Sequence, residues 1–282
     1  MKARRLEEIL FKGLMIISLA LVLTALAGII FVVVMKGASA LSLSMIMETP
    51  KGGYYLGKEG GIANAIVGSL YLAFGASFLS IVLSIPIALA MQREYTGHVA
   101  ANCSRLVMDI LWGMPSIVYG AFGFVVMMYF GLRSSLLGGI IVLTLLMLPI
   151  MIRSMEEMIR MVPRELKEIS YSLGTTKIET MVSVVLRQAM PGVITAVLLA
   201  FGRGIGDAAS ILFTAGYTDY IPRSLLDPVA SLPLAIFFQS ATPIPEVQGR
   251  AYAAALILLI IVLLVNIVSR ILGWRSSRYI IR

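Results

Sequence analysis

The chain has 282 residues, of which 59% are hydrophobic and 13% charged, and its formal net charge is +8 at pH 7. This composition excludes an ordinary soluble domain and is typical of an integral membrane protein. The positive charge does not indicate nucleic-acid binding, because Lys and Arg collect at one side of membrane proteins, near anionic lipid headgroups. One cysteine excludes an intramolecular disulfide, and the lone His98 has no clustered partners, so we predict neither a metal site nor a cofactor.

Six apolar stretches are long enough to cross about 30 Å of hydrocarbon. They lie near 11–35, 64–91, 106–130, 134–152, 189–216 and 251–273. We therefore expect one all-α transmembrane domain over residues 1–282, with a charged loop at 153–188. No small-residue cleavage site follows the first stretch, which favours an uncleaved span over a signal peptide.

The positions of Lys and Arg predict the orientation in the membrane. Sixteen of them fall on one side and six on the other, which places both chain ends and the 153–188 loop in the cytoplasm. The inner ones are Lys2, Arg4, Arg5, Lys12, Arg93, Arg105, Arg153, Arg160, Arg164, Lys167, Lys177, Arg187, Arg270, Arg275, Arg278 and Arg282. The outer ones are Lys36, Lys51, Lys58, Arg133, Arg223 and Arg250.

The first three spans differ in character. The first carries aliphatic residues throughout and is expected to face lipid, and the glycine-rich loop after it favours turns and matches no phosphate-binding loop. The second carries small residues that let helices approach closely, which predicts an inner helix. These are Gly68, Ser69, Gly75, Ala76, Ser77, Ser80 and Ser84.

The third span contains a proline between glycines, Gly113-Met-Pro115-Ser116-Ile-Val-Tyr-Gly120. Such an interruption frees backbone groups inside the membrane, and in transporters interrupted helices line a substrate cavity. We therefore interpret Pro115 and Ser116 as residues of a substrate path. The alternative is a kink without function.

The 153–188 loop carries six Lys/Arg and five Asp/Glu between Arg153 and Arg187, so it cannot lie in lipid. A helix is predicted over Arg164–Ser172, preceded by Pro163 and ended by Gly174. Its apolar positions have helical spacing: Leu166, Ile169 and Leu173. A second short amphipathic run follows over Lys177–Leu186.

This loop resembles the cytoplasmic "EAA" loop of ABC importer permeases. The resemblance rests on Glu168-Ile-Ser-Tyr-Ser-Leu-Gly174 and, after nine residues, Val184-Val-Leu186. It implies that the loop helix docks in a groove of an ATPase subunit. The residues implied in this coupling are Glu168, Ser170, Gly174, Val184 and Leu186. Ile169 and Ser170 replace the two alanines of the motif and Arg187 replaces its proline, and the alternative is a solvated loop.

The fifth span places Arg203 near the middle of an apolar stretch, where an ionised arginine costs about 3 kcal/mol or more. Asp207 follows four residues later and is expected on the same helix face. The two residues are either part of a substrate path or a structural pair that neutralises itself. Beyond them, Leu225–Ala241 is apolar but about 17 residues long and contains two prolines, which predicts a re-entrant or interfacial segment.

Taken together, the order of these pieces resembles the phosphate ABC-transporter permeases of the PstA type over nearly the whole chain. The stretches that carry the resemblance are Gly60-Gly-Ile-Ala-Asn-Ala-Ile-Val-Gly68, Gly113–Gly120, the loop around Glu168 and Gly174, Gly202-Arg-Gly-Ile-Gly-Asp207, Leu212-Phe-Thr-Ala215 and Ala251-Tyr-Ala-Ala-Ala255. The family normally has Glu at the position of Asp207.

The resemblance implies a permease subunit that pairs with a second permease of the PstC type, a cytoplasmic ATPase dimer and an extracytoplasmic phosphate-binding protein. It aligns Arg203 with the arginine associated with phosphate passage. The chain has no Gly-x-x-x-x-Gly-Lys-[Ser/Thr] run, so ATP hydrolysis is expected on the partner subunit. The alternatives are a permease for another oxyanion such as sulfate or molybdate, an ion-coupled carrier without an ATPase, and a structural scaffold.

Overall fold

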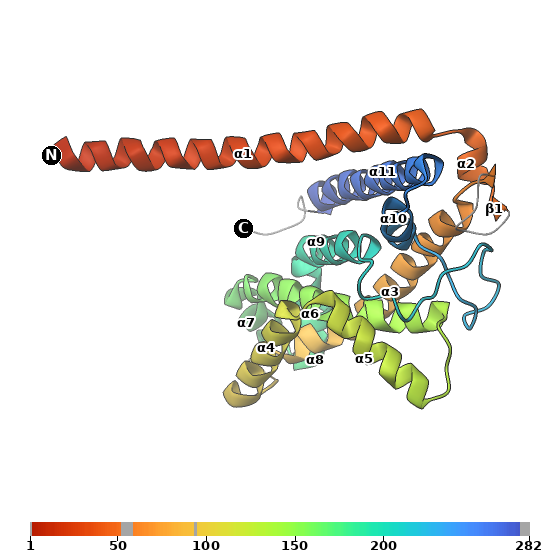
Figure 1. The fold of residues 1–282 in the computed structure, drawn as a ribbon. Helices are drawn as coiled ribbons and strands as arrows, with labels where there is room; N and C mark the ends of the chain where they lie inside the picture. The colour runs from red at the N-terminus through yellow and green to blue at the C-terminus, as the bar shows by residue number, and fades with distance from the viewer. Residues whose placement is uncertain (1, 52–58, 93–94, 277–282) are drawn as a thin grey trace.

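The structure is a computed structural model that describes residues 2–51, 59–92 and 95–276 (Figure 1). In chain order its helices are α1 (Lys2–Ala40), α2 (Leu43–Met47), α3 (Ala63–Ala90), α4 (His98–Gly113), α5 (Ser116–Tyr129), α6 (Leu136–Arg160), α7 (Arg164–Ser172), α8 (Lys177–Thr180), the π-helical turn η1 (Met181–Val185), α9 (Leu186–Ile205), α10 (Leu232–Ser240) and α11 (Pro245–Ser276). Two short antiparallel strands, β1 (Pro50–Lys51) and β2 (Glu59–Gly60), complete the described part.

The predicted all-α membrane fold is confirmed. Five helices of the described part are long and apolar enough to cross a membrane, and the bent pair α4 and α5 makes a sixth crossing if it is counted as one span. The start of α1, the end of α11 and α7 lie at one end of the molecule, and α2 and β1 lie at the other (Figure 1). Arg93, Arg278, Arg282 and Lys58, which the charge count also used, lie outside the described residues.

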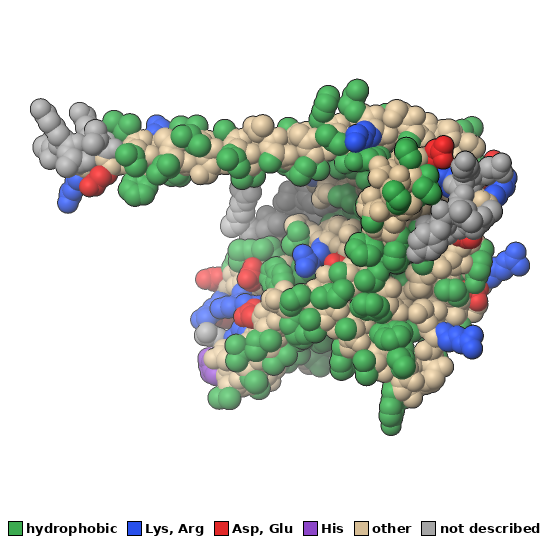
Figure 2. Space-filling model, viewed as in Figure 1, with side chains coloured by type: hydrophobic (Ala, Val, Ile, Leu, Met, Phe, Trp, Pro, Cys, Tyr) green, Lys and Arg blue, Asp and Glu red, His purple; other side chains and the backbone are tan. Residues whose placement is uncertain are grey.

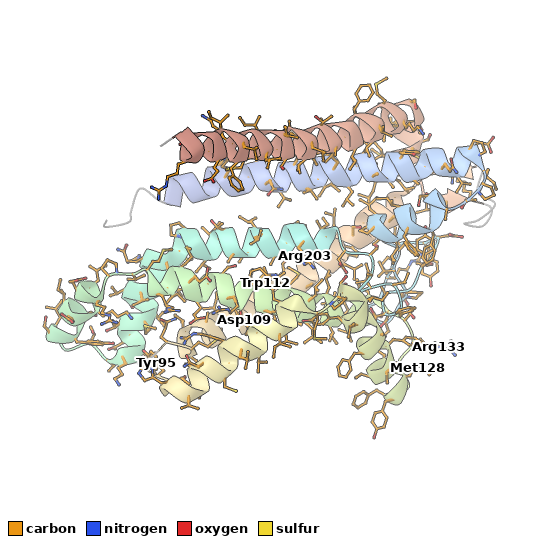
Figure 3. All side chains as sticks on the ribbon, turned by 60° about the vertical axis from the view of Figure 1, so that its left-hand side comes forward. Tyr95, Asp109, Trp112, Met128, Arg133 and Arg203 are labelled. Atoms are coloured by element: carbon orange, nitrogen blue, oxygen red, sulfur yellow. The ribbon has the colours of Figure 1, made fainter. Side chains whose placement is uncertain are left out.

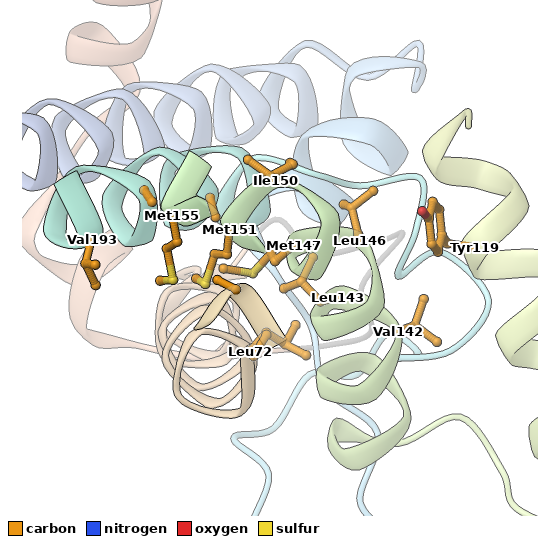
Figure 4. Close-up of a cluster of buried hydrophobic side chains, with 14 of the residues drawn as sticks. Leu72, Tyr119, Val142, Leu143, Leu146, Met147, Ile150, Met151, Met155 and Val193 are labelled. Carbon is orange, nitrogen blue, oxygen red and sulfur yellow. The ribbon is translucent and has the colours of Figure 1, made fainter. Parts of the chain in front are cut away.

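The core forms where α3 packs against α6. Methionine and leucine side chains of α6, among them Leu143, Met147 and Met151, are buried in this core (Figure 4). They meet the small residues of α3, where the Ser80 hydroxyl donates to the Thr144 carbonyl. Ala76, Ser77, Ser80 and Ser84 are buried, so the prediction that the second span is an inner helix is confirmed.

Helix α1 lies at the edge of the molecule and exposes apolar side chains along its length (Figure 2). It packs against α11, which is of comparable length. The two come together at Gly37, where an added Cβ would lie 2.7 Å from the Tyr252 carbonyl oxygen. A glycine is needed there because any side chain would separate the helices.

The third apolar stretch is not one straight helix. Helices α4 and α5 meet at Met114 and Pro115 with a bend of 100°. Pro115 has no N–H to donate to the Leu111 carbonyl, which would be its helical partner. The Met114 amide and the Tyr119 hydroxyl donate to that carbonyl instead, at 3.1 and 2.8 Å. The carbonyl that Pro115 leaves without its helical partner is therefore bonded inside the protein.

A network of four charged side chains fixes α4 to α6. Glu156 is fully buried and accepts from Arg105 at 2.6 Å and from Arg153 at 2.7 Å. Arg153 also pairs with Asp109 of α4 at 2.7 Å. The two carboxylates and two guanidinium groups balance in charge, which is the condition under which buried ions are tolerated.

We predict that Glu156→Gln destabilises the protein by about 3 kcal/mol, because it leaves two guanidinium groups without their shared carboxylate. The matched control is Glu157→Gln, since its exposed neighbouring side chain should tolerate the same change within about 0.5 kcal/mol. Thermal unfolding of the purified variants measures both effects. Equal melting temperatures for the two variants would contradict this role of the network.

Candidate functional site

Arg203 lies in the last turn of α9 and its side chain is exposed. Within residues 2–51, 59–92 and 95–276 its guanidinium group has no hydrogen bond and no ion pair. The position in the last turn favours a cation, because the carbonyl end of a helix carries partial negative charge. The five N–H groups of Arg203 are thus available to a ligand.

A cavity of about 620 Å³ opens beside this side chain. It lies between four helices, α4, α6, α9 and α11, and Figure 3 shows Trp112 of α4 close to Arg203. The other lining residues are Ile150, Leu198, Leu199, Gly202, Gly206, Asp207, Val262 and Asn266. Ile150 and Val262 lie near the middle of their helices, so the cavity is at mid-depth in the helix bundle.

The position and the hydrogen-bond partner of Asp207 both differ from what we expected from the sequence. Helix α9 ends at Ile205, so Asp207 lies beyond the helix and not one turn further along its face. It does not pair with Arg203 in the structure, although both line the cavity. Its carboxylate accepts from the Ser210 amide at 2.8 Å, as an N-cap side chain does at the start of a turn.

The expected continuous span over 189–216 is interrupted, because helix α9 ends at Ile205. Turns replace the helix after Ile205, and two backbone carbonyl groups of these turns are bonded to neighbouring segments. The Ser135 amide donates to the Thr214 carbonyl at 2.8 Å, and the Val229 amide donates to the Ala215 carbonyl at 2.9 Å. Irregular backbone at this depth is tolerated only when it is bonded within the protein or lines a cavity.

Gly120 allows this turn segment to pass close to α5. An added Cβ at Gly120 would lie 2.7 Å from the Ser210 carbonyl oxygen and 2.8 Å from that of Ala209. Pro115 and Ser116, predicted to lie on the substrate path, do not line the cavity. They form the break that directs α4 toward the cavity and α5 away from it, and Trp112 is the residue of this region that reaches the cavity.

Two residues that line the cavity were not predicted from the sequence. Trp112 gave no signal, because an aromatic residue in an apolar stretch is usual. Asn266 did give one, since it is a polar residue within the last apolar span. Its amide nitrogen donates to the Val262 carbonyl at 2.9 Å, so its amide oxygen remains available to accept a hydrogen bond.

The predicted loop helix is confirmed as α7 (Arg164–Ser172), with Pro163 as its N-cap and Gly174 after it at φ +85°. The second predicted helix is not separate, because α8 continues through η1 into α9 and the whole helix runs from Lys177 to Ile205. Its start is fixed by a capping box between Thr176 and Glu179.

The buried face of α7 differs in part from the expected one, since of its three predicted apolar positions Leu166 packs against the core and the other two do not. Lys167 and Ser170 are buried, whereas Ile169 and Leu173 are 58% and 79% exposed. The cause is a hydroxyl cluster, in which Ser170 lies 2.7 Å from the Thr175 hydroxyl and 3.0 Å from that of Thr180. Polar groups therefore help to hold α7 against α8, and Ile169 and Leu173 face outward.

The residues implied in ATPase coupling fall into two groups. Glu168 and Gly174 are exposed, while Ser170 is buried and Val184 and Leu186 are half-buried. Four exposed apolar residues of the segment from α7 to η1 were not singled out from the sequence as contact residues: Ile169, Leu173, Ile178 and Val182. We call these four the apolar knob.

The sequence of this chain is similar to those of known transport proteins. A family model described as "Binding-protein-dependent transport system inner membrane component" matches residues 80–278. The chain is 34% identical to the "Phosphate transport system permease protein PstA" of Yersinia pestis, over 88% of this chain and 83% of that protein. It is 31% identical to the "Phosphate transport system permease protein PstA 1" of Mycobacterium tuberculosis, over 98% and 91%.

A further relative is the "Probable ABC transporter permease protein YqgI" of Bacillus subtilis, which is 30% identical over 96% of both chains. Among solved structures, an inward-facing conformation of the MetNI methionine ABC transporter aligns with a TM-score of 0.63, covering 76% of this chain and 95% of that one. The sequence identity is 18%, so this likeness concerns the fold alone. It confirms the predicted importer-permease fold.

We predict different effects for two substitutions of Asp207, because its carboxylate acts here as a cap. Asp207→Asn keeps an acceptor oxygen for the Ser210 amide and should leave the melting temperature unchanged, whereas Asp207→Ala should cost about 1 kcal/mol. Thermal unfolding of the purified variants tests this. If Asn is as destabilising as Ala, the negative charge matters more than the cap.

Proposed function

The chain belongs to the binding-protein-dependent transport system inner membrane components, and we propose on this basis that it is the permease subunit of an ATP-driven importer of inorganic phosphate. In this proposal it forms half of the translocation path. ATP hydrolysis occurs on a separate subunit, and this chain contributes transport only.

The observation that carries the proposal is the unpaired guanidinium group of Arg203 beside a mid-depth cavity. Exposure of this charge to hydrocarbon would cost about 3 kcal/mol or more, so the surface that carries it has to face water, an anion or another subunit. A translocation path between two permease subunits provides such a surface. A purely structural scaffold does not explain a charge that has no partner among the residues the structure describes.

Phosphate is the substrate named for the PstA relatives, and the side chains of the cavity suit it. A guanidinium group binds phosphate oxygens through two parallel hydrogen bonds. Sulfate and molybdate could use the same two bonds, so a permease for another oxyanion is the alternative within this class. Competition between these anions during uptake by the reconstituted complex distinguishes them.

The apolar knob is the proposed docking surface for the ATPase. Its four side chains are exposed at one end of the molecule, and exposed apolar groups of this kind mark protein interfaces. We infer a complex with a cytoplasmic ATPase dimer, a second permease of the PstC type and an extracytoplasmic phosphate-binding protein. An ion-coupled carrier would need no ATPase, so copurification of an ATPase subunit excludes that alternative.

One continuous helix connects the apolar knob to the cavity. It runs from Lys177 to Ile205, and Lys177 and Arg203 are about 40 Å apart along it at 1.5 Å per residue. A tilt imposed at the knob by closure of the ATPase dimer would therefore move Arg203. We propose that this motion opens the cavity alternately to the two sides of the membrane, with both chain ends and the 153–188 loop in the cytoplasm of a cell-membrane protein.

We predict that Arg203→Lys reduces phosphate uptake about tenfold or more while the complex still assembles. Lysine keeps the charge but loses the planar pair of donors that matches phosphate. The measurement is uptake of labelled phosphate into proteoliposomes, at equal amounts of incorporated protein. Arg133→Lys is the matched control, because Arg133 is exposed and lies outside the cavity.

Folding of the Arg203 variants distinguishes the proposal from a structural role. Because Arg203 has no partner among the described residues, Arg203→Gln should retain the melting temperature of the parent protein. A structural role predicts the opposite, namely poor insertion or early unfolding. Uptake at the parent rate by Arg203→Lys would contradict the path role.

We predict that Leu173→Glu uncouples transport by weakening ATPase docking by about 2 kcal/mol, since it places a charge in an apolar contact. Val99→Glu is the matched control, an equally exposed apolar position on α4 outside the knob. The measurements are ATPase copurification and phosphate uptake. The proposal that the ATPase docks at this surface would be wrong if Leu173→Glu and Val99→Glu copurified equal amounts of ATPase.

A further inference from the structure

A second polar cavity, of about 710 Å³, lies at the opposite end of the molecule from the apolar knob. It is formed by the last turn of α1, the start of α2 and the first two turns of α11. Its charged and hydroxyl-bearing lining includes Lys36, Ser39, Ser42, Glu246, Arg250 and Tyr252. It shares no residue with the cavity beside Arg203.

The charges of this cavity favour an anion. Lys36 and Arg250 outnumber the one carboxylate in the lining, that of Glu246. The Lys36 ammonium lies 3.5 Å from the Tyr252 hydroxyl and 4.8 Å above its ring centre, so it is held at the cavity. Arg250 also lines the cavity, where it is 8% exposed and interacts with other groups of the protein.

An apolar crevice of about 260 Å³ adjoins the polar cavity and shares Gln248 and Tyr252 with it. Its other lining residues include Val33, Ile236, Ala251 and Ala255. Val33 is about one turn closer to the middle of α1 than Lys36, and Ala255 is about two turns closer to the middle of α11 than Gln248. The crevice therefore lies deeper in the bundle than the polar cavity.

We propose that the cavity and the crevice together bind one anionic phospholipid. The phosphate group would lie near Lys36, Arg250 and the Tyr252 hydroxyl, and an acyl chain would fill the crevice between α1, α10 and α11. The two compartments have the order in depth that a lipid requires, with the basic groups at the helix ends and the apolar groups toward the membrane centre. The charge count places Lys36 and Arg250 on the outer side, so the lipid would belong to the outer leaflet.

Inorganic phosphate carries the same kind of anionic oxygens as a phospholipid headgroup, so it is the second candidate ligand to test. It would use the polar cavity but leave the crevice unfilled, whereas a phospholipid uses both compartments. A variant that blocks only the crevice therefore separates the two ligands. Ala255→Phe is such a variant, because Ala255 lines the crevice and not the polar cavity.

The experiment is native mass spectrometry of the purified full-length protein titrated with phosphatidylglycerol, and with phosphatidylcholine of the same acyl chains. Lys36→Gln should raise the phosphatidylglycerol concentration for half occupancy about tenfold, since it removes a charge-assisted hydrogen bond. Glu246→Gln should lower it, because it removes the opposing charge. Arg133→Gln, an exposed basic residue outside both compartments, is the matched control and should change nothing.

The outcomes decide between the ligands. Weaker phosphatidylglycerol binding in both Lys36→Gln and Ala255→Phe, with unchanged phosphatidylcholine binding, supports the lipid site. Equal binding of the two lipids, or an unchanged Lys36→Gln, overturns it. If inorganic phosphate displaces phosphatidylglycerol completely and Ala255→Phe has no effect, the cavity binds a free anion and the lipid assignment is wrong.

Discussion

An arginine charge at mid-depth in a membrane has to be met by water, by an anion or by another protein group, and the structure around Arg203 follows from this requirement. Helix α9 ends beside it, which adds the favourable field of the helix carbonyl end. Four helices leave a cavity of about 620 Å³ there. Asp207 also lines this cavity, but within the described part of the chain no carboxylate pairs with Arg203, and its guanidinium group is the one cationic group in the lining.

The same constraint applies to the backbone wherever a helix breaks at this depth. At Pro115 the freed Leu111 carbonyl is met by the Tyr119 hydroxyl. After Ile205 the carbonyl groups of the turns are met by amides of neighbouring segments, and Gly120 gives these turns room. The cavity is thus bordered by two helix ends at which several freed polar groups are bonded within the protein, whereas Arg203 has no partner among the described residues and remains available to substrate.

Composition and periodicity predicted the features that depend on local chemistry: the helical membrane fold, the buried small-residue face of α3, the break at Pro115 and the helix Arg164–Ser172. They did not predict how several side chains are used once the chain is packed. The inward face of α7 is set by the hydroxyl cluster around Ser170, and the Asp207 carboxylate accepts from the Ser210 amide instead of pairing with Arg203. Trp112 reaches the cavity because the chain breaks at Met114, which directs α4 toward the cavity.

The most direct test of the path is thiol labelling of Gly202→Cys in a Cys103→Ser background. Gly202 lines the cavity and an added Cβ there would meet no other atom within 4 Å, so the variant should fold. The account predicts that a water-soluble thiol reagent labels this cysteine in the assembled complex and that phosphate slows the labelling. Labelling at the same rate with and without phosphate, or no labelling in any state of the ATPase, would contradict it.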